Sequence, residues 1–260
     1  MIGSAAPFTV RYLGGPTAVL EVGGVRLVTD PTFDPPGAYP IGKRELVKTM
    51  GPAYGPEKAG AADAVLLSHH QHPDNLDKLG AAYVAEAPLT LSTPSAADRL
   101  GGAVRALPAW EAYDLPRPDG GTLQVTGVPA LHGPPGSEPL VGEVTGFVLS
   151  GAGLPTVYVS GDNASLDHVR TIAARLGPFD AALLFAGAAQ TPLAGSAYLT
   201  LTSDEAAEAA RVLAPAHVIP LHFEGWAHFT QGRDDLRAAF ARAGLLDRVT
   251  LLEPGESATV

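Results

Sequence analysis

The residues best suited to chemistry lie in the segment 68–75, Ser-His-His-Gln-His-Pro-Asp-Asn, which directly follows the apolar run Ala64–Leu67. This segment places imidazoles and a carboxylate at the end of an expected buried strand. Imidazole nitrogen and carboxylate oxygen are ligands for borderline cations such as zinc. Three more side chains of these types follow other apolar runs: His132, Asp162 and His222. Because a sheet holds the loops at its strand ends rigidly, four such segments can converge, and the sequence predicts a metal centre.

The elements that would position these side chains are short strands, followed by alternating strands and helices. Strands are expected at 8–13, 17–22, 25–29, 64–67, 89–92, 104–107, 123–128, 146–149, 156–159, 181–185, 217–221 and 249–252. Helices are expected at about 75–85, from a cap at Thr93 or Ser95 to residue 100, at 166–176, from a capping box at 202–205 to residue 213, and at 234–243. The Pro- and Gly-rich segment 31–60 predicts a long loop, either a functional lid or a plain surface excursion.

The composition is that of a globular chain, with 46% hydrophobic and 17% charged residues among 260. Formal net charge is −10 without a block of Lys or Arg, so nucleic acid and anionic membranes are not expected as partners. Cysteine is absent, so a metal site must use nitrogen and oxygen ligands. No secretory signal and no run long enough to span a bilayer is recognisable, and we expect a cytoplasmic protein. One domain spanning residues 1–260, with two sheets between outer helices, fits this order of elements.

Taken in order, the candidate residues resemble the signature of the metallo-β-lactamase superfamily of metal-dependent hydrolases. That signature is His-x-His-x-Asp-His, a distant His, an Asp after Gly, and a final His. The corresponding positions here are His70, His72, Asp74, Asn75, His132, Asp162 and His222. The segment 222–229 is similar to one in the branch of L-ascorbate-6-phosphate lactonase-like proteins. The resemblance covers nearly the whole chain and implies an α+β fold, a four-layer αββα sandwich of two mixed β-sheets flanked by helices.

The resemblance also implies roles for these residues in a binuclear metal site. The metal ligands would be His70, His72 and His132 at one site, Asp74, Asn75 and His222 at the other, and a bridging Asp162. The cofactor would be one or two Zn²⁺ ions, with Mn²⁺ or Fe²⁺ as alternatives. Asp74 would also act in catalysis, by orienting the attacking water or accepting its proton.

Asn75 departs from the signature, which has His at that place. An amide oxygen is a poorer ligand than imidazole, so the second site would be weaker, hold a harder metal such as manganese, or recruit His69. His69 could equally donate a hydrogen bond to a ligand or be an exposed bystander.

Two further residues have open roles. His228 could polarise the substrate or protonate a leaving group, or it could be a structural histidine. Asp30 could hydrogen-bond a ligand histidine, or simply form a turn before Pro31. Trp226 and Phe229 could pack the pocket wall.

The predicted function is a zinc-dependent hydrolase that uses a metal-activated water to cleave an ester, lactone, amide or phosphodiester bond of a small molecule. A non-catalytic or mononuclear metal-binding module with a degraded second site is the alternative that Asn75 favours. An iron redox enzyme is a weaker third reading, because it would usually act with a flavin partner domain. Lys43, Arg44 and Lys48 could meet an anionic substrate or be ordinary solvated charges. The sequence leaves open the substrate and whether the chain forms a homo-oligomer.

Overall fold

The N-terminal strands form an antiparallel meander with a tight glycine turn. β1 (Phe8–Gly14), β2 (Thr17–Val22) and β3 (Val25–Thr29) pair in chain order in the computed structural model, which describes residues 8–260. Gly23 and Gly24 between β2 and β3 have φ angles of 57° and 81°. A type I′ hairpin turn requires this left-handed conformation, which glycine adopts without strain.

The meander belongs to a seven-stranded mixed sheet with the order β15-β1-β2-β3-β6-β7-β8. Its other strands are β6 (Ala64–Leu66), β7 (Thr90–Ser92), β8 (Val104–Ala106) and β15 (Ser257–Thr259). Strands β3, β6, β7 and β8 are parallel neighbours. Helices α2 (Lys78–Glu86) and α3 (Pro94–Leu100) make the crossovers between β6, β7 and β8, as parallel pairing requires.

A six-stranded mixed sheet forms the other half, with the order β14-β13-β12-β11-β10-β9. Its strands are β9 (Ala112–Pro116), β10 (Thr122–Pro129), β11 (Thr145–Ser150), β12 (Val157–Val159), β13 (Ala181–Phe185) and β14 (His217–Leu221). Strands β12, β13 and β14 are parallel, whereas β9, β10, β11 and β12 pair antiparallel.

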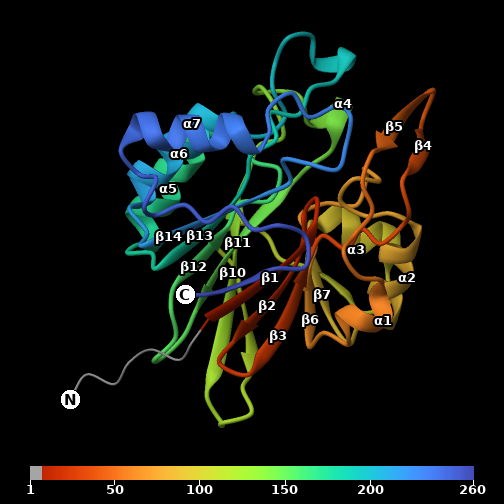
Figure 1. Ribbon diagram of the computed structural model, residues 1–260. Coiled ribbons are helices and arrows are strands. Elements are labelled where there is room, and N and C mark those ends of the chain that lie inside the picture. Colours follow the sequence, from red (N-terminus) through yellow and green to blue (C-terminus); the bar gives the residue numbers. More distant parts are fainter. Residues whose placement is uncertain (1–7) are drawn as a thin grey trace.

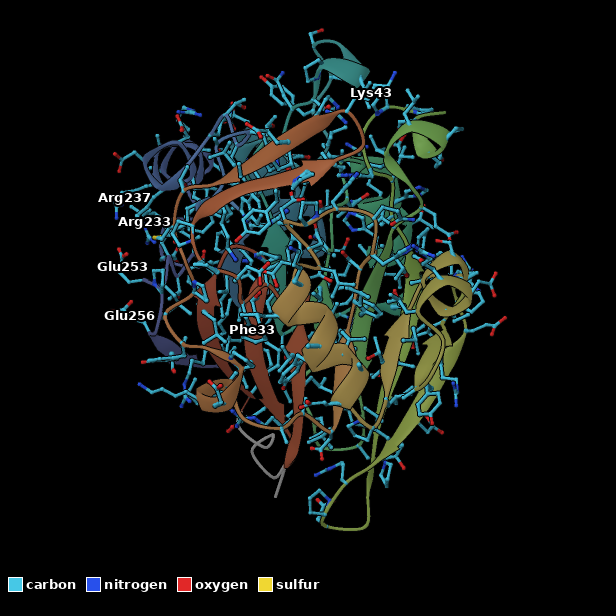
Figure 2. All side chains as sticks on the ribbon, turned by 90° about the vertical axis from the view of Figure 1, so that its right-hand side faces the viewer. Phe33, Lys43, Arg233, Arg237, Glu253 and Glu256 are labelled. Carbon is cyan, nitrogen blue, oxygen red and sulfur yellow. The ribbon has the colours of Figure 1, made fainter. Side chains whose placement is uncertain are left out.

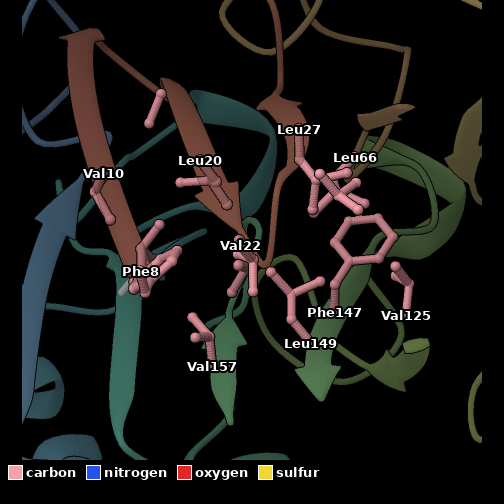
Figure 3. Packing of buried hydrophobic residues seen from close by; sticks show 14 of the residues in the cluster. Phe8, Val10, Leu20, Val22, Leu27, Leu66, Val125, Phe147, Leu149 and Val157 are labelled. Atoms are coloured by element: carbon pink, nitrogen blue, oxygen red, sulfur yellow. The ribbon is translucent and has the colours of Figure 1, made fainter. Parts of the chain in front are cut away.

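The main hydrophobic core lies between the two sheets. Leu20 and Leu66 from the first sheet pack in one cluster with Phe147 and Leu149 from the second, and Figure 3 shows these side chains meeting between the layers. Burying a side chain of this size contributes about 1.5–3 kcal/mol. Alternate residues of the same strands, such as Val19, face outward into a separate cluster beneath the helices, which is the period-two pattern of a sheet covered on both faces.

Helices cover the outer faces of both sheets (Figure 1). On one side lie α2, α3 and the short α1 (Pro56–Ala59); on the other lie α5 (Leu166–Leu176), α6 (Ser203–Leu213) and α7 (Arg233–Ala243). Two shorter elements are α4 (Glu138–Val141) and the 3-10 turn η1 (Pro192–Ala194). This arrangement confirms the predicted αββα sandwich. No helix within residues 8–260 has both the length and the apolar character needed to cross a membrane.

The segment 31–60 differs from the expected loop because it contains a β-hairpin. β4 (Gly37–Ile41) and β5 (Arg44–Lys48) pair antiparallel around Gly42, whose φ is 59°. Figure 2 shows Lys43 at the tip of this hairpin. Within residues 8–260 the two strands form a sheet of their own, and a single further bridge joins Lys48 to Trp226. A strand outside the main sheets has no continuous apolar run, so periodicity alone did not reveal it.

Two other expectations, for a closing strand and for the start of a helix, differ from the structure. The predicted closing strand 249–252 makes only a single bridge, between Val249 and Val218, and β15 is the strand that closes the first sheet. The predicted helix at 75–85 begins at Lys78, because the Asp77 side chain caps it by accepting a hydrogen bond from the Gly80 amide. The capping box of α6 is confirmed, with Thr202 and Glu205 bonded reciprocally.

Candidate metal centre

The candidate ligands lie on loops that follow strands of both sheets. Residues 68–77 follow β6, His132 follows β10, Asp162 follows β12 and His222 follows β14. In the second sheet β10 and β12 both run antiparallel to β11, and β14 is parallel to β12 through β13. The carboxyl ends of β10, β12 and β14 therefore meet at one edge of the sheet, and this edge collects the side chains predicted to form the site.

One group of three histidines consists of His69, His72 and His132, whose nearest ring nitrogens all lie within 4.8 Å of one another. His69 Nε2 is 3.0 Å and His132 Nε2 is 3.3 Å from His72 Nδ1. Burial and then the neighbouring His132 lower the pKa of His72 to about 4. Burial likewise lowers the pKa of His69 well below its usual value. Neutral imidazole is the form that coordinates a metal.

The structure places His69, and not the expected His70, in this group. His69 is fully buried, and its Nδ1 lies 3.0 Å from the Ser68 hydroxyl. The His70 backbone amide is turned to the side chain of Gln71 at 3.1 Å, and the His70 ring is only half-buried. The chain therefore presents residues 69 and 72 to the site, a spacing of His-x-x-His. The extra histidine beside the motif was the one sequence signal for this arrangement.

A second group brings together Asp74, Asp162 and His222, all buried. His222 Nε2 lies 3.4 Å from Asp74 Oδ2 and 3.5 Å from Asp162 Oδ1. Burial alone would lower the pKa of His222, but the Asp162 and Asp74 carboxylates outweigh it and raise the pKa to about 10. In the absence of a cation, the paired carboxylates therefore hold a proton on His222, which indicates a strong local preference for positive charge.

Unpaired atoms in the second group fit a bound cation. Asp74 Oδ1, Asp162 Oδ2 and both ring nitrogens of His222 are buried and have no hydrogen-bond partner within residues 8–260. A buried polar atom left without a partner costs about 1–3 kcal/mol. One ligand atom of each of the three side chains lies within 4.8 Å of the other two, and carboxylate oxygen with imidazole nitrogen is a donor set that zinc or manganese accepts.

Asn75 lies beside this group as a hydrogen-bond donor. Its Nδ2 donates to Asp162 Oδ1 at 2.9 Å and to Asp30 Oδ2 at 3.3 Å. Because both acceptors are carboxylates, the amide nitrogen must face them, and only Oδ1 remains for a metal. Among the described residues that oxygen has no other partner. Asn75 thus acts as a hydrogen-bond donor to Asp162, and its role as a metal ligand stays a prediction.

Asp30 supports the histidine group through an intermediate residue. Its carboxylate accepts a hydrogen bond from the Ser68 hydroxyl at 2.7 Å, and the same hydroxyl contacts His69 Nδ1. The expected direct bond from Asp30 to a ligand histidine is replaced by this relay. Burial raises the pKa of Asp30 to about 7, against the opposing effect of the Ser68 amide.

His228 joins the site from the segment that follows β14. Its Nε2 lies 3.0 Å from Asp74 Oδ2. Phe229 packs against both His222 and His228, with ring centroids 4.7 Å and 4.6 Å away. Trp226 is buried under the hairpin, where its ring packs 5.9 Å from Tyr39, so it supports the hairpin without lining the cavity.

A cavity of ≈ 370 Å³, counting its space open to solvent, lies over the metal-ligand groups. His72, Asp74, His132 and His228 line one side of it. The remaining lining residues are Ile41, Arg44 and Leu46 of the hairpin, Val141 of α4, and Ala189, Gln190, Thr191 and Leu199. The hairpin therefore lines the same cavity as the candidate ligands, as the functional alternative for segment 31–60 requires. Sequence reasoning missed Ile41 and Leu46, which only a period-two reading of the hairpin could have indicated.

Comparisons with known sequences add proteins of similar length. A metal-dependent hydrolase (UPF0173) of Pyrobaculum arsenaticum is 29% identical over 257 residues, covering 95% of this chain and 97% of that protein. One from Pyrococcus furiosus is 30% identical over 135 residues, covering 52% of this chain and 54% of the relative. The part of this chain that aligns thus spans about half the length of the second protein and nearly all of the first.

The fold has close counterparts among solved structures. A structure described as a possible metal-dependent hydrolase from Veillonella parvula has a TM-score of 0.83 at 18% identity, covering 98% of this chain and 100% of that one. At this level of identity the likeness shows the fold alone. The family model of the beta-lactamase superfamily domain matches residues 25–223, a span that includes the loops carrying both groups of candidate ligands. The chain belongs to the beta-lactamase superfamily.

Proposed function

We propose that this protein is a metal-dependent hydrolase with a binuclear zinc centre, which cleaves an ester, lactone, amide or phosphodiester bond of a small molecule. The observation that carries the proposal is the pair of adjoining three-residue groups of ligand atoms, set under a cavity. The family of the chain and the names of its relatives, which are called metal-dependent hydrolases, support the same proposal.

The two groups differ in the cation that they would favour. His69, His72 and His132 offer three neutral nitrogens, which suit zinc. Asp74, Asp162 and His222 offer more oxygen, and a harder ion such as manganese is an alternative there. Asp162 lies between the groups, because Oδ2 is 3.8 Å from His132 Nδ1 while Oδ1 faces His222. Asp162 is therefore the proposed bridging ligand.

A bound divalent cation would lower the pKa of an attacking water towards 7 and polarise the scissile carbonyl or phosphoryl group. In this proposal Asp74 accepts the proton of that water. Its Oδ2 is shared with His228, which lines the cavity. His228 can therefore orient Asp74 and deliver a proton to the leaving group as the bond breaks, which gives the histidine a catalytic role.

A mononuclear enzyme or binding module is the second candidate. It is favoured by Asn75, because an asparagine supplies no imidazole to the second group. Its amide nitrogen already donates to Asp162 and Asp30. The histidine group would then hold the one cation, with Asp74 and Asp162 nearby as unliganded carboxylates.

Metal content decides between these functions. The protein is purified without chelator, analysed for metal per chain, and analysed again after loading with zinc or manganese. About two metals per chain, together with metal-dependent turnover in a panel of esters, lactones and phosphodiesters, is the expected result. One metal would favour the mononuclear candidate, and no metal after loading would overturn the proposed function.

A further inference from the structure

The hairpin presents one face to the cavity. In β5, Arg44, Leu46 and Lys48 are the more buried residues, whereas the intervening Glu45 and Val47 are exposed. The register pairs Arg44 with Ile41 across the two strands. Because side chains alternate between the faces of a strand, Arg44 lies on the same inner face as Leu46.

The three basic residues of this region have different surroundings. Lys48 is buried and paired with Asp77 at 3.1 Å. Lys43 is exposed at the hairpin tip (Figure 2). Arg44 lines the cavity, and among the described residues it is the one lysine or arginine that does so.

Arg44 is held in place without its charge being neutralised. Its Nη1 donates to Thr191 Oγ1 at 2.6 Å, which joins the hairpin to the segment across the cavity. Within residues 8–260 no carboxylate lies within ion-pair distance of Arg44, although several other arginines have such a partner. A guanidinium carries five N–H donors, so most of its donors remain for a ligand.

The surroundings of Arg44 indicate the chemistry of that ligand. Ile41, Leu46, Val141 and Leu199 make apolar walls beside it. The chain has a net charge of −10, so a negative group bound away from the proposed metal centre needs a positive partner of its own. The planar guanidinium fork matches a carboxylate in bidentate geometry. One cation also matches a single negative charge better than the two charges of a phosphate monoester.

We propose that Arg44 binds the carboxylate of a substrate with an apolar body, at the end away from the bond that is cleaved. This inference rests on the proposed function, because it names the substrate class of the same cavity. Arg44 is thus a specificity-determining residue, and the substrate class is a carboxylic acid that also carries a hydrolysable ester, lactone or amide group.

Binding of simple acids tests the proposal independently of turnover. Zinc-loaded protein is titrated calorimetrically with succinate, glutarate and adipate, and with the monocarboxylates of equal carbon number. One carboxylate can face the metal centre and the other Arg44, so at least one diacid is expected to bind about 10-fold more tightly than its monoacid. Arg44→Leu should abolish this preference, and the exposed Lys43→Leu should retain it.

Arg44→Lys serves as a second variant, because lysine keeps the charge but loses the fork. It should show a reduced preference while keeping the hairpin intact. No diacid preference in the wild type, or an unchanged preference in Arg44→Leu, would overturn the inference.

Ester hydrolysis separates this inference from the proposed function. The 4-nitrophenyl monoester of the preferred diacid is compared with the uncharged ester of the same length. A kcat/KM advantage for the charged ester that disappears in Arg44→Leu is expected. If both esters are turned over and Arg44→Leu leaves the ratio of their kcat/KM values unchanged, the role of Arg44 is overturned and the proposed function is not. No turnover of either ester would count against the hydrolase, while the calorimetric comparison would still decide the binding role.

Discussion

At the scale of single residues, a one-residue difference in spacing decides which histidines meet. The superfamily signature has one residue between its first two histidines, whereas His69 and His72 are separated by two. The Ser68 hydroxyl, held by Asp30, fixes the ring of His69. This anchoring turns His69 inward and leaves His70 beside Gln71.

Replacing His69 with alanine is expected to weaken zinc binding by at least about 100-fold, more than the loss of an outer hydrogen-bonding partner would. The matched His70→Ala variant should keep the zinc content of the wild type. Elemental analysis after dialysis measures both, and thermal unfolding checks that both variants are folded. A loss of zinc in His70→Ala with zinc retained in His69→Ala would contradict this arrangement.

Asp162 and Asn75 should differ in the same assay. Asp162→Ala removes the proposed bridging carboxylate and is expected to empty the second site completely. Asn75→Ala removes only the donor that orients Asp162, so affinity should fall by about 10–100-fold. Titration of metal-free protein with zinc gives both affinities. Equal losses in the two variants would show that Asn75 ligates as strongly as Asp162.

At the scale of elements, a buried ion pair joins the hairpin to the loop that carries the ligands. Lys48 Nζ lies 3.1 Å from Asp77 Oδ2 and donates to the Thr32 carbonyl at 3.3 Å. Asp77 also accepts from the amides of Phe33 and Gly80. The carboxylate thus caps α2 and fixes the base of the hairpin at once.

Lys48→Met is expected to lower the free energy of unfolding by about 3–5 kcal/mol, because it leaves the Asp77 carboxylate buried without its counter-charge. Lys43→Met at the exposed tip should change stability by less than about 0.5 kcal/mol. Urea unfolding measures both variants. A Lys48→Met variant as stable as Lys43→Met would mean that the backbone donors alone satisfy Asp77.

At the scale of the whole molecule, the proposed metal centre would tie the two sheets together. His69, His72 and Asp74 follow a strand of the first sheet, whereas the other ligands follow strands of the second. A cation bound by both sets would favour the folded state, since the unfolded chain does not gather these ligands.

Removing the metal should therefore destabilise the protein. At a metal concentration of about 1,000 Kd, binding contributes about 4 kcal/mol, so chelation should lower Tm by on the order of 10 °C. Calorimetry of the loaded and the chelated protein measures the shift. The Asp162→Ala variant is the control, and chelation should lower its Tm by much less. A wild-type Tm that chelation leaves unchanged would exclude a structural contribution from the metal.

Elements with strong local signals were predicted well. The strands β2 and β3 and the helix α5 have the expected bounds, because alternation, glycine turns and caps are properties of neighbouring residues. The predicted strand at 249–252 was wrong, although its residues are apolar, because Val249 finds only one bridging partner. Val249 lies beside the edge strand β14, so a sheet edge is available, and how far the run pairs with it depends on tertiary packing that the run itself does not encode.

The sequence by itself determined the kinds of candidate ligand, the strands that precede them and the superfamily, since these depend on residue type and local order. The tertiary structure decided which histidine faces inward and which basic residue reaches the cavity. Both outcomes depend on contacts between distant positions: Asp30 with Ser68, Lys48 with Asp77, and Arg44 with Thr191. Such contacts form only when the two sheets and the hairpin have packed, because hydrogen-bond partners are chosen by proximity in space and not by proximity in the chain.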